Sequence, residues 1–207
     1  MPDLSKRYLF RMTHIENIPH IYEYGITHVD SPNADPTYVP IGDSSIISRR
    51  NDLVVRGGRI LGEFIPFYFG TCMPMLYVIQ KGFNGVRATA AGEIVYCITS
   101  AQQIINHQLD FLFTDGHAVD SFSSFYSLPD INNIDHYIDL NAINKKFWKD
   151  ENDLDLKRRK EAEFLVGNDI PTTAILGFAV YDDAAKNRLI GFGIDSNKVT
   201  VKKGFYF

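Results

Sequence analysis

The chain has 207 residues, of which 45% are hydrophobic and 22% are charged. These fractions lie near the globular average and exclude a disordered chain or a disulfide-rich scaffold. The formal net charge of −4 excludes a polycationic nucleic-acid binder, so any contact with nucleic acid must come from a local basic surface. The length predicts a single domain over residues 1–207 that folds without disulfides or metal.

The first third of the chain predicts a strand, a helix and a long irregular stretch. Residues 8–12 are typical of a short aromatic strand, and residues 15–24 carry isoleucines at helical spacing before Gly25, a common helix stop. Residues 26–63 show little periodicity, which is unusual inside a compact domain. We interpret them as a loop that covers a ligand, with a short helix over residues 44–50.

The middle of the chain predicts several strands. Three runs of aromatic and aliphatic side chains are interpreted as strands, over residues 64–69, 75–80 and 93–99. Pro66 indicates an edge strand or a bulge, because proline has no N–H for the ladder. Residues 101–107 predict a helix.

The second half predicts strands separated by a helical stretch. Strands are expected over residues 111–113, 163–166 and 173–181. Residues 118–160 are expected to be mostly helical, with one helix over residues 140–149, and the last 25 residues to form edge strands and turns. Strands at both ends with helices between them predict an α+β fold with a mixed or antiparallel sheet.

The two cysteines, Cys72 and Cys97, form no CxxC pattern and have no histidine at metal-ligand spacing. We interpret them as buried thiols in a reducing cytoplasm. The N-terminal segment lacks the apolar run of a signal peptide, and no stretch approaches the roughly 20 apolar residues of a membrane span. A cytoplasmic protein with no membrane partner and no metal site is therefore predicted.

The segment KRRKEAEFLV, residues 157–166, is the strongest candidate for a catalytic element. Residues two apart on a strand share a face, so Glu161 and Glu163 can point into one site. A fixed carboxylate beside cations suits a ribose hydroxyl or a developing positive charge on a sugar. The alternative is a solvated helix end that runs into a strand, and spacing alone favours it.

Three other groups of residues can be interpreted in two ways each. His14 at the end of the first strand suits a ligand hydroxyl or pyrophosphate, but a lone histidine is more often structural. The aromatic residues 64–69 suit a planar ring or a core strand. The arginines between residues 49 and 59 suit phosphates or an ordinary charged loop. The chain has no GxGxxG, P-loop, HExxH or GxSxG motif, so it gives no support to a Rossmann, ATPase, zinc-protease or hydrolase function.

Taken together and in order, five segments resemble the DarT family of DNA ADP-ribosyltransferase toxins over residues 8–181. They are RMTHIENI, ISRR, FIPFYF with MPMLY, FTDGHA and KRRKEAEFLV. The resemblance implies an ADP-ribosyltransferase-like α+β fold, in which a split, twisted, mixed or antiparallel sheet with flanking helices holds NAD+ between its halves. It also implies transfer of ADP-ribose from NAD+ to a base in single-stranded DNA, with thymidine favoured, and release of nicotinamide.

The resemblance also implies roles for single residues. Glu163 matches the catalytic glutamate, and Arg50 matches the catalytic arginine. Because Arg49 is adjacent, the assignment of the catalytic arginine is open between these two residues. The residues expected to bind NAD+ are Thr13, His14, Asn17, Arg50, Tyr68, Phe69 and Met75. His117 in the TDGH turn is expected at the rim of the site, where DNA approaches.

The basic residues of the 120–160 region suggest where DNA would lie. Lysines and arginines there offer phosphate contacts and aromatic side chains offer stacking, although lysines on a helix are usually just a solvated face. The DNA-binding candidates beside His117 are Lys145, Lys146, Trp148, Arg158 and Arg159, and Lys157 and Lys160 offer further cations.

Two alternatives stay open at this stage. One is the same fold acting on guanosine, RNA or protein, and Glu161, which stands where the family more readily has glutamine, would influence that choice. A catalytically silent NAD- or nucleic-acid-binding module is disfavoured because Glu163 and both candidate arginines are present. The family further implies a DarG-like macrodomain antitoxin as a partner that reverses the modification.

Overall fold

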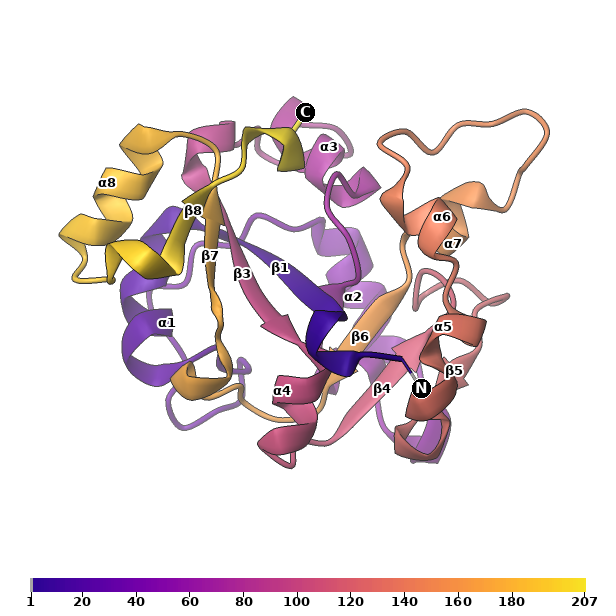
Figure 1. The fold of residues 1–207 in the computed structure, drawn as a ribbon. Coiled ribbons are helices and arrows are strands. Elements are labelled where there is room, and N and C mark those ends of the chain that lie inside the picture. The colour runs from indigo at the N-terminus through magenta and orange to yellow at the C-terminus, as the bar shows by residue number, and fades with distance from the viewer. Residues whose placement is uncertain (1) are drawn as a thin grey trace.

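Residues 2–207, described by a computed structural model, form short strands and helices around one mixed sheet (Figure 1). The strands are β1 (Tyr8–His14), β2 (Ile65–Tyr68), β3 (Ile94–Ser100), β4 (Phe111–Thr114), β5 (Phe125–Tyr126), β6 (Glu163–Val166), β7 (Gly177–Val180) and β8 (Val199–Val201). The helices are α1 (Ile18–Tyr24), α2 (Ser44–Asp52), α3 (Pro74–Lys81), α4 (Ala101–Asn106), α5 (Ile134–Tyr137), α6 (Leu140–Asn144), α7 (Leu156–Lys160) and α8 (Asp183–Gly191).

The sheet is divided in its middle. Its order is β5-β4-β6-β2-β1-β3-β7-β8, antiparallel except for the parallel pair β7–β8. Strand β1 pairs with β3 along its whole length, and β2 does so with β6, but β1 and β2 meet in register only at Phe10 and Tyr68. The predicted α+β fold with a split, mixed sheet is therefore confirmed.

Pro66 marks the place where the two halves separate. It pairs in register with Leu165 of β6, and its carbonyl accepts a hydrogen bond from Arg11 Nη1 at 3.1 Å. Because proline has no N–H, it cannot extend the ladder toward β1. The prediction of an edge strand was wrong, because β2 lies inside the sheet. The proline nevertheless coincides with the interrupted pairing between β2 and β1.

The N-terminal predictions are confirmed. The expected first strand is β1, the helix after it ends at Tyr24, and Gly25 adopts a positive φ of 84° in close contact with the carbonyl of Ile170. The expected short helix in the irregular stretch is α2. Cys72 and Cys97 are buried and free, as predicted.

The prediction of a strand over residues 75–80 was wrong, because this segment is helix α3. Pro74 stands at the first helical position, where its missing N–H costs nothing, and Gly82 ends the helix with a φ of 70°. A short continuous apolar run cannot be assigned to strand or helix by periodicity alone. The flanking proline and glycine are the signals that favoured the helix.

Residues 118–160 are less helical than predicted. Only short helices occur there, namely α5, α6, α7 and a 3-10 helix over Leu128–Asn133, together with the two-residue strand β5. The helix expected over residues 140–149 ends at Asn144, and residues 145–155 are irregular.

The C-terminal prediction was wrong in part. Residues 183–191 form helix α8, capped by the Asp182 side chain, which accepts a hydrogen bond from the Ala185 N–H at 2.9 Å. The expected strand over residues 173–181 is shortened to β7, and only β8 is an edge strand of the C-terminal segment.

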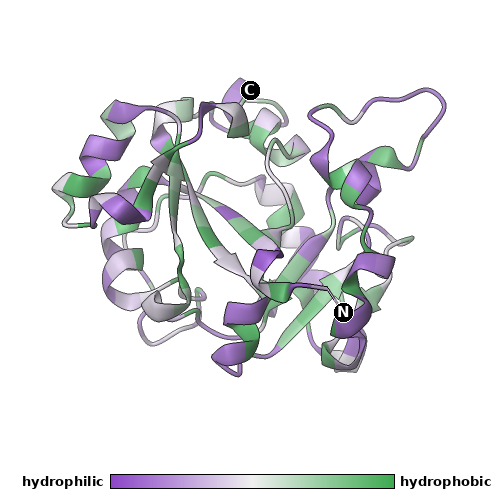
Figure 2. Cartoon of the chain, viewed as in Figure 1, coloured by the Kyte–Doolittle hydropathy of each residue, from purple (hydrophilic) through white to green (hydrophobic). Residues whose placement is uncertain are grey.

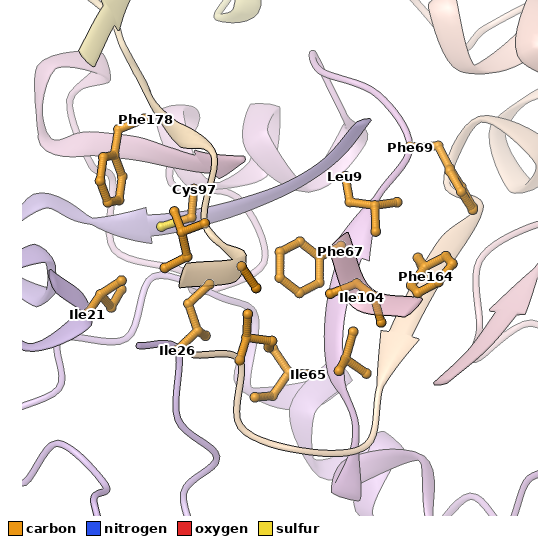
Figure 3. Close-up of a cluster of buried hydrophobic side chains, with 14 of the residues drawn as sticks. Leu9, Ile21, Ile26, Ile65, Phe67, Phe69, Cys97, Ile104, Phe164 and Phe178 are labelled. Atoms are coloured by element: carbon orange, nitrogen blue, oxygen red, sulfur yellow. The ribbon is translucent and has the colours of Figure 1, made fainter. Parts of the chain in front are cut away.

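The main hydrophobic core packs against the sheet and fixes strand β6 (Figure 3). Phe164 stacks on Phe111 with ring centroids 4.7 Å apart and lies edge-on to Phe69 at 6.0 Å. All four residues of β6 are buried. Figure 2 shows hydrophobic residues concentrated on the strands and hydrophilic ones toward the outer helices and loops. The residue that opens β6, Glu163, is therefore held by a rigid neighbourhood.

Tyr206 ties the C-terminal segment to the sheet and gives a stability prediction. Its buried hydroxyl donates to the carbonyl of Ile94 at 3.0 Å or to that of Ala179 at 3.1 Å. We expect Tyr206→Phe to lower the free energy of unfolding by about 1–3 kcal/mol, because buried carbonyls lose their donor. Urea denaturation measures the change. Tyr22→Phe, at a ring that is 42% exposed, is the matched control and should leave the midpoint unchanged.

Candidate active site

Glu163 is the most enclosed acidic side chain of the site, with 1% of its surface exposed. Its Oε2 accepts a hydrogen bond from Arg50 Nη1 at 2.8 Å, and its Oε1 accepts one from the backbone N–H of Ala118 at 2.8 Å. Charge-assisted bonds of this kind are short and directional. The carboxylate is thus fixed in one orientation at the start of β6.

Arg50 reaches Glu163 from helix α2. The helix begins at a buried cap, Asp43, whose carboxylate accepts hydrogen bonds from the N–H and the hydroxyl of Ser45. The Ser45 hydroxyl bond holds the pKa of Asp43 below its usual value. Arg50 is 8% exposed, whereas Arg49 lies on the exposed face of the helix. Of the two candidate arginines, the structure brings Arg50 to Glu163.

One donor of Arg50 has no partner within residues 2–207. Its Nη2 is buried and makes no hydrogen bond, and it is the one buried side-chain polar atom of the described residues in that state. Leaving a buried donor unsatisfied costs about 1–3 kcal/mol. A ligand oxygen placed beside Glu163 would satisfy it, so the pair fits a site for a polyhydroxylated or phosphorylated molecule.

The turn after β4 encloses the other side of the carboxylate. His117 Nε2 lies 3.9 Å from Glu163 Oε1. The Thr114 hydroxyl accepts a hydrogen bond from the Glu163 N–H at 3.0 Å and donates to the Gly116 carbonyl at 2.6 Å. Sequence reasoning missed Thr114 and the Ala118 N–H. The TDGH turn could have pointed to Thr114, whereas a backbone donor leaves no signal in residue type.

The two aromatic candidates and the one methionine candidate for NAD+ binding lie in different surroundings. Tyr68 is opposite Glu163 in the β2–β6 register, and burial followed by the Glu163 charge raises the pKa of its phenol well above the usual value. Phe69 lies in the core beside Phe164 (Figure 3). Met75, on α3, packs against a second apolar cluster. Tyr68 is the one of the three that adjoins the Glu163 carboxylate.

Thr13 and Asn17 organise the segment that leads to α2. The Asn17 amide donates to the Thr13 hydroxyl at 2.9 Å and to the Val39 carbonyl at 2.9 Å, and its oxygen accepts from the Val39 N–H at 2.8 Å. His14 caps the turn after β1, where its Nδ1 accepts from the Glu16 N–H at 3.2 Å. These residues therefore fix the loop that the sequence predicted to cover a ligand.

The prediction that Glu161 and Glu163 share one face of a strand was wrong. Glu161 is the capping residue directly after α7, which ends at Lys160, and β6 begins only at Glu163. Glu161 is nevertheless 6% exposed, and burial raises the pKa of its carboxyl.

The basic candidates of the 145–160 region have three different environments. Lys145 and Lys146 are exposed, and Trp148 is half-buried. Arg158 pairs with Asp155 and Asp115, and Arg159 pairs with Asp139, Asp153 and Asp155. Lys160 is fully buried, so the expectation that it contacts phosphate was wrong.

A cleft of about 390 Å³ opens between α2 and the turn after β4, and one of its lining residues, His117, lies 3.9 Å from Glu163. It is lined by Ser45, Ile46, Arg49, His117, Val119, Asp120, Ser121 and Phe122. Phe122 is 83% exposed. A larger hollow of about 510 Å³, lined by residues 135–141, contains none of the candidate residues.

Residues 2–207 contain neither a metal-binding cluster nor a membrane-spanning helix. No group of three or more His, Cys, Asp or Glu side chains is arranged to hold a metal ion. None of the helices in this range combines the length and the apolar character that crossing a bilayer requires.

Solved structures share this fold over the whole chain. Thermus sp. 2.9 DarT in complex with ADP-ribosylated ssDNA superposes with a TM-score of 0.83 at 27% identity, covering 100% of this chain and 98% of that one. Thermus sp. 2.9 DarT in complex with NAD+ gives 0.79 at 26% identity, over 100% and 99%. With its split sheet and buried Glu163–Arg50 pair, the protein is an NAD+-dependent ADP-ribosyltransferase by class.

The family model described as "ssDNA thymidine ADP-ribosyltransferase, DarT" matches residues 10–207, and the chain belongs to this family. A DNA ADP-ribosyl transferase of Thermus sp. (strain 2.9) is 33% identical, over 84% of this chain and 80% of the relative. One from Escherichia coli O127:H6 is 29% identical, over 98% and 94%. A fusion with a DNA ADP-ribosyl glycohydrolase from Thermosipho africanus is 29% identical, over 88% of this chain and 45% of the fusion. The resemblance stated from the sequence is confirmed.

Proposed function

We propose that the protein transfers ADP-ribose from NAD+ to thymidine in single-stranded DNA and releases nicotinamide. The observation that carries the proposal is the Glu163 carboxylate, fixed by Arg50 and by the Ala118 N–H, with Arg50 Nη2 left for a ligand. The relatives support the choice of substrates, because Thermus sp. 2.9 DarT has been solved with NAD+ and with ADP-ribosylated ssDNA.

Glu163 supplies the negative charge that the reaction needs. Breaking the bond between nicotinamide and ribose builds positive charge at the ribose C1′, and a fixed carboxylate stabilises that charge without having to reorient. Because Glu163 is 1% exposed, its field is little screened by water. The same carboxylate would accept a hydrogen bond from a ribose hydroxyl and so orient the sugar.

Arg50 acts on both the carboxylate and the substrate. Nη1 orients Glu163, while Nη2 is placed to donate to a substrate oxygen. A guanidinium carries its donors in a rigid fork, so one side chain can serve two acceptors at fixed angles. Thr13 and Asn17 contribute by fixing the loop before α2, and Tyr68 lies beside the carboxylate.

The acceptor base would enter through the cleft between α2 and the turn after β4. The imide nitrogen of thymine is a poor nucleophile until it loses its proton, so a base must lie within reach. Glu163 is the buried acceptor at this point, and His117 is 3.9 Å from it. A single strand presents its bases without the free-energy cost of opening a duplex, which favours it as the substrate.

Exposed cations of the 145–149 stretch provide a path for the DNA backbone. Lys145 and Lys146 offer phosphate contacts, and Trp148 offers a ring for stacking. Arg158 and Arg159 are engaged by carboxylates of their own chain, so we assign them to holding this region rather than to direct phosphate binding.

A DarG-like macrodomain antitoxin is the proposed partner. The Thermosipho africanus relative joins a DNA ADP-ribosyl transferase to a DNA ADP-ribosyl glycohydrolase in one chain. A glycohydrolase that removes ADP-ribose from DNA would restore the base that this protein modifies. Adding such an enzyme to the modified oligonucleotide should return its original mass.

Mass spectrometry of a mixed-sequence single-stranded oligonucleotide, incubated with the protein and NAD+, tests the proposed reaction. We expect one added ADP-ribose mapped to thymine and an equal amount of free nicotinamide. An adduct on guanine, or an adduct only on RNA or protein supplied in parallel, would contradict the proposed acceptor. An absence of nicotinamide release would contradict enzymatic activity altogether.

The DNA path makes a prediction about salt. Affinity for a single-stranded oligonucleotide should fall with salt, with a log–log slope of about −0.7 for each neutralised phosphate. Lys145→Gln and Lys146→Gln should each reduce that slope by about 0.7. Fluorescence anisotropy with a labelled oligonucleotide measures it, and Lys198→Gln, at an exposed residue beside the far edge strand β8, is the matched control. Equal slopes for all four proteins would contradict the assignment.

A further inference from the structure

Lys160 is a buried cation that the proposed chemistry does not use. It is 0% exposed, and its Nζ donates to the backbone carbonyl of Ile143 at 3.0 Å and to that of Lys145. Burial lowers the pKa of its ammonium to about 8. Desolvating a charge is unfavourable unless hydrogen bonds compensate it, so the two carbonyls explain how the ammonium is accommodated.

The two carbonyls belong to the place where helix α6 gives way to residues 145–155, which we call the α6–α7 loop. This loop projects from the body of the molecule at the upper right of Figure 1, and Figure 2 shows it as mainly hydrophilic. The last carbonyls of a helix lack partners inside the helix and need other donors. Lys160 supplies such a donor, and it thereby fixes the direction in which the loop leaves α6.

The basic and acidic residues of the loop lie in different halves of it. Its second half is acidic, but Asp153 pairs with Arg159, and Asp155 pairs with Arg158 and Arg159. The first half, from Lys145 to Lys149, carries three lysines, of which one, Lys145, faces Asp150 at 3.4 Å. Ion pairs thus engage Asp150, Asp153 and Asp155, whereas Glu151 is exposed outside them. The exposed Lys146 and Lys149 give the basic half an excess of positive charge.

Aromatic contacts hold the basic half at a second point. Trp148 lies edge-on to Tyr77 of α3, with ring centroids 5.7 Å apart, and edge-on to Phe207 at 5.8 Å. Lys146 Nζ lies 5.8 Å from the centre of the Phe207 ring. The stretch between Lys145 and Trp148 is therefore fastened at both ends, at Lys160 and at α3.

We propose that Lys160 is a positioning residue for the DNA strand: by binding the carbonyls of Ile143 and Lys145, it fixes the basic half of the α6–α7 loop in the orientation that receives phosphates. This inference rests on the proposed function, because it assigns the loop to the DNA substrate. Lys160 lies three residues before Glu163 on one continuous segment, so the same element positions the carboxylate and the DNA-binding loop.

Steady-state kinetics of Lys160→Met test the proposal, because methionine keeps the length and apolar character of the stem and removes the donors. We expect the KM for a single-stranded oligonucleotide to rise about tenfold, because the misplaced loop would lose roughly one good phosphate contact. The kcat and the KM for NAD+ should stay within about threefold, since Glu163 and Arg50 are untouched. Lys198→Met removes a lysine at an exposed position and should change none of these parameters.

Limited trypsin digestion measures directly how accessible the loop is to cleavage, and it does not depend on which acceptor the enzyme uses. Cleavage after Lys145, Lys146 and Lys149 should be faster in Lys160→Met than in the wild type, and a saturating oligonucleotide should protect these sites in the wild type. If Lys160→Met does not fold, Lys160→Gln, which retains an amide donor, replaces it in both assays.

The outcomes separate the two proposals. An unchanged KM for DNA together with unchanged trypsin cleavage would overturn the role of Lys160. Parallel loss of kcat, NAD+ affinity and thermal stability would overturn it too, because the residue would then serve the whole fold. A wild-type protein that leaves DNA unmodified would contradict the proposed function. If, in addition, the oligonucleotide did not protect the loop from trypsin, the proposed contact between the loop and DNA would be contradicted too.

Discussion

Glu163→Gln is expected to lower the rate of DNA ADP-ribosylation by about 10²- to 10³-fold, the usual effect of removing one preorganised electrostatic group. The change keeps the shape of the side chain but removes the charge that faces the ribose C1′ and the acceptor for the thymine proton. Rates are measured from the mass shift of a single-stranded oligonucleotide at saturating NAD+.

The control for this variant is Glu23→Gln, at an exposed residue of α1, which should retain the wild-type rate. Glutamine at position 163 can still accept from either Arg50 or the Ala118 N–H, so the protein should fold, and thermal unfolding checks that it does. A folded Glu163→Gln protein with the rate within tenfold of the wild type would contradict the assigned role.

Arg50→Lys is expected to lower kcat by about 10²-fold, whereas Arg49→Lys should leave it within a few-fold. Lysine keeps the charge but cannot donate from two fixed directions, so it cannot orient Glu163 and also bind a substrate oxygen. Arg49 is exposed and lines the cleft, where a lysine can replace it.

The adjacent arginines make a matched pair, because the substitution, the helix and the charge are the same. Both variants are compared in the oligonucleotide assay at saturating NAD+ and DNA, so that kcat is separated from binding. A larger loss of kcat in Arg49→Lys than in Arg50→Lys would reverse the assignment of the two residues.

Local patterns predicted most elements near the site correctly. The run from Glu163 to Val166 is short, apolar and bounded by charges, and it is strand β6. The segment MLYVIQ has the same apolar character, yet it forms α3, because Pro74 and Gly82 set the ends of a helix. All four residues of β6 are buried, whereas only Leu76 and Ile79 of MLYVIQ are buried, at helical spacing. The residue types alone do not reveal this difference, and the flanking residues decide.

The prediction that Glu161 and Glu163 share one face of a strand was wrong for a related reason. Spacing by two residues places side chains on one face only if both lie in the strand, and α7 continues to Lys160. Lys160, the last residue of this helix, is held by another segment, because its ammonium donates to the carbonyls of Ile143 and Lys145. No local pattern indicates that four consecutive cations divide into an exposed lysine, two ion-paired arginines and a buried lysine.

The sequence by itself determined the family, the α+β class, the reaction to be expected and the identity of Glu163 as the catalytic candidate, since ordered motifs and short-range periodicity carry this information. Only the tertiary structure decided which arginine meets Glu163, which backbone N–H holds its second oxygen, and which lysine is buried. Arg50 and Ala118 lie 113 and 45 residues from Glu163 in the chain. Contacts over such separations depend on how the two halves of the sheet and the segments between them pack, and that packing is a property of the whole chain.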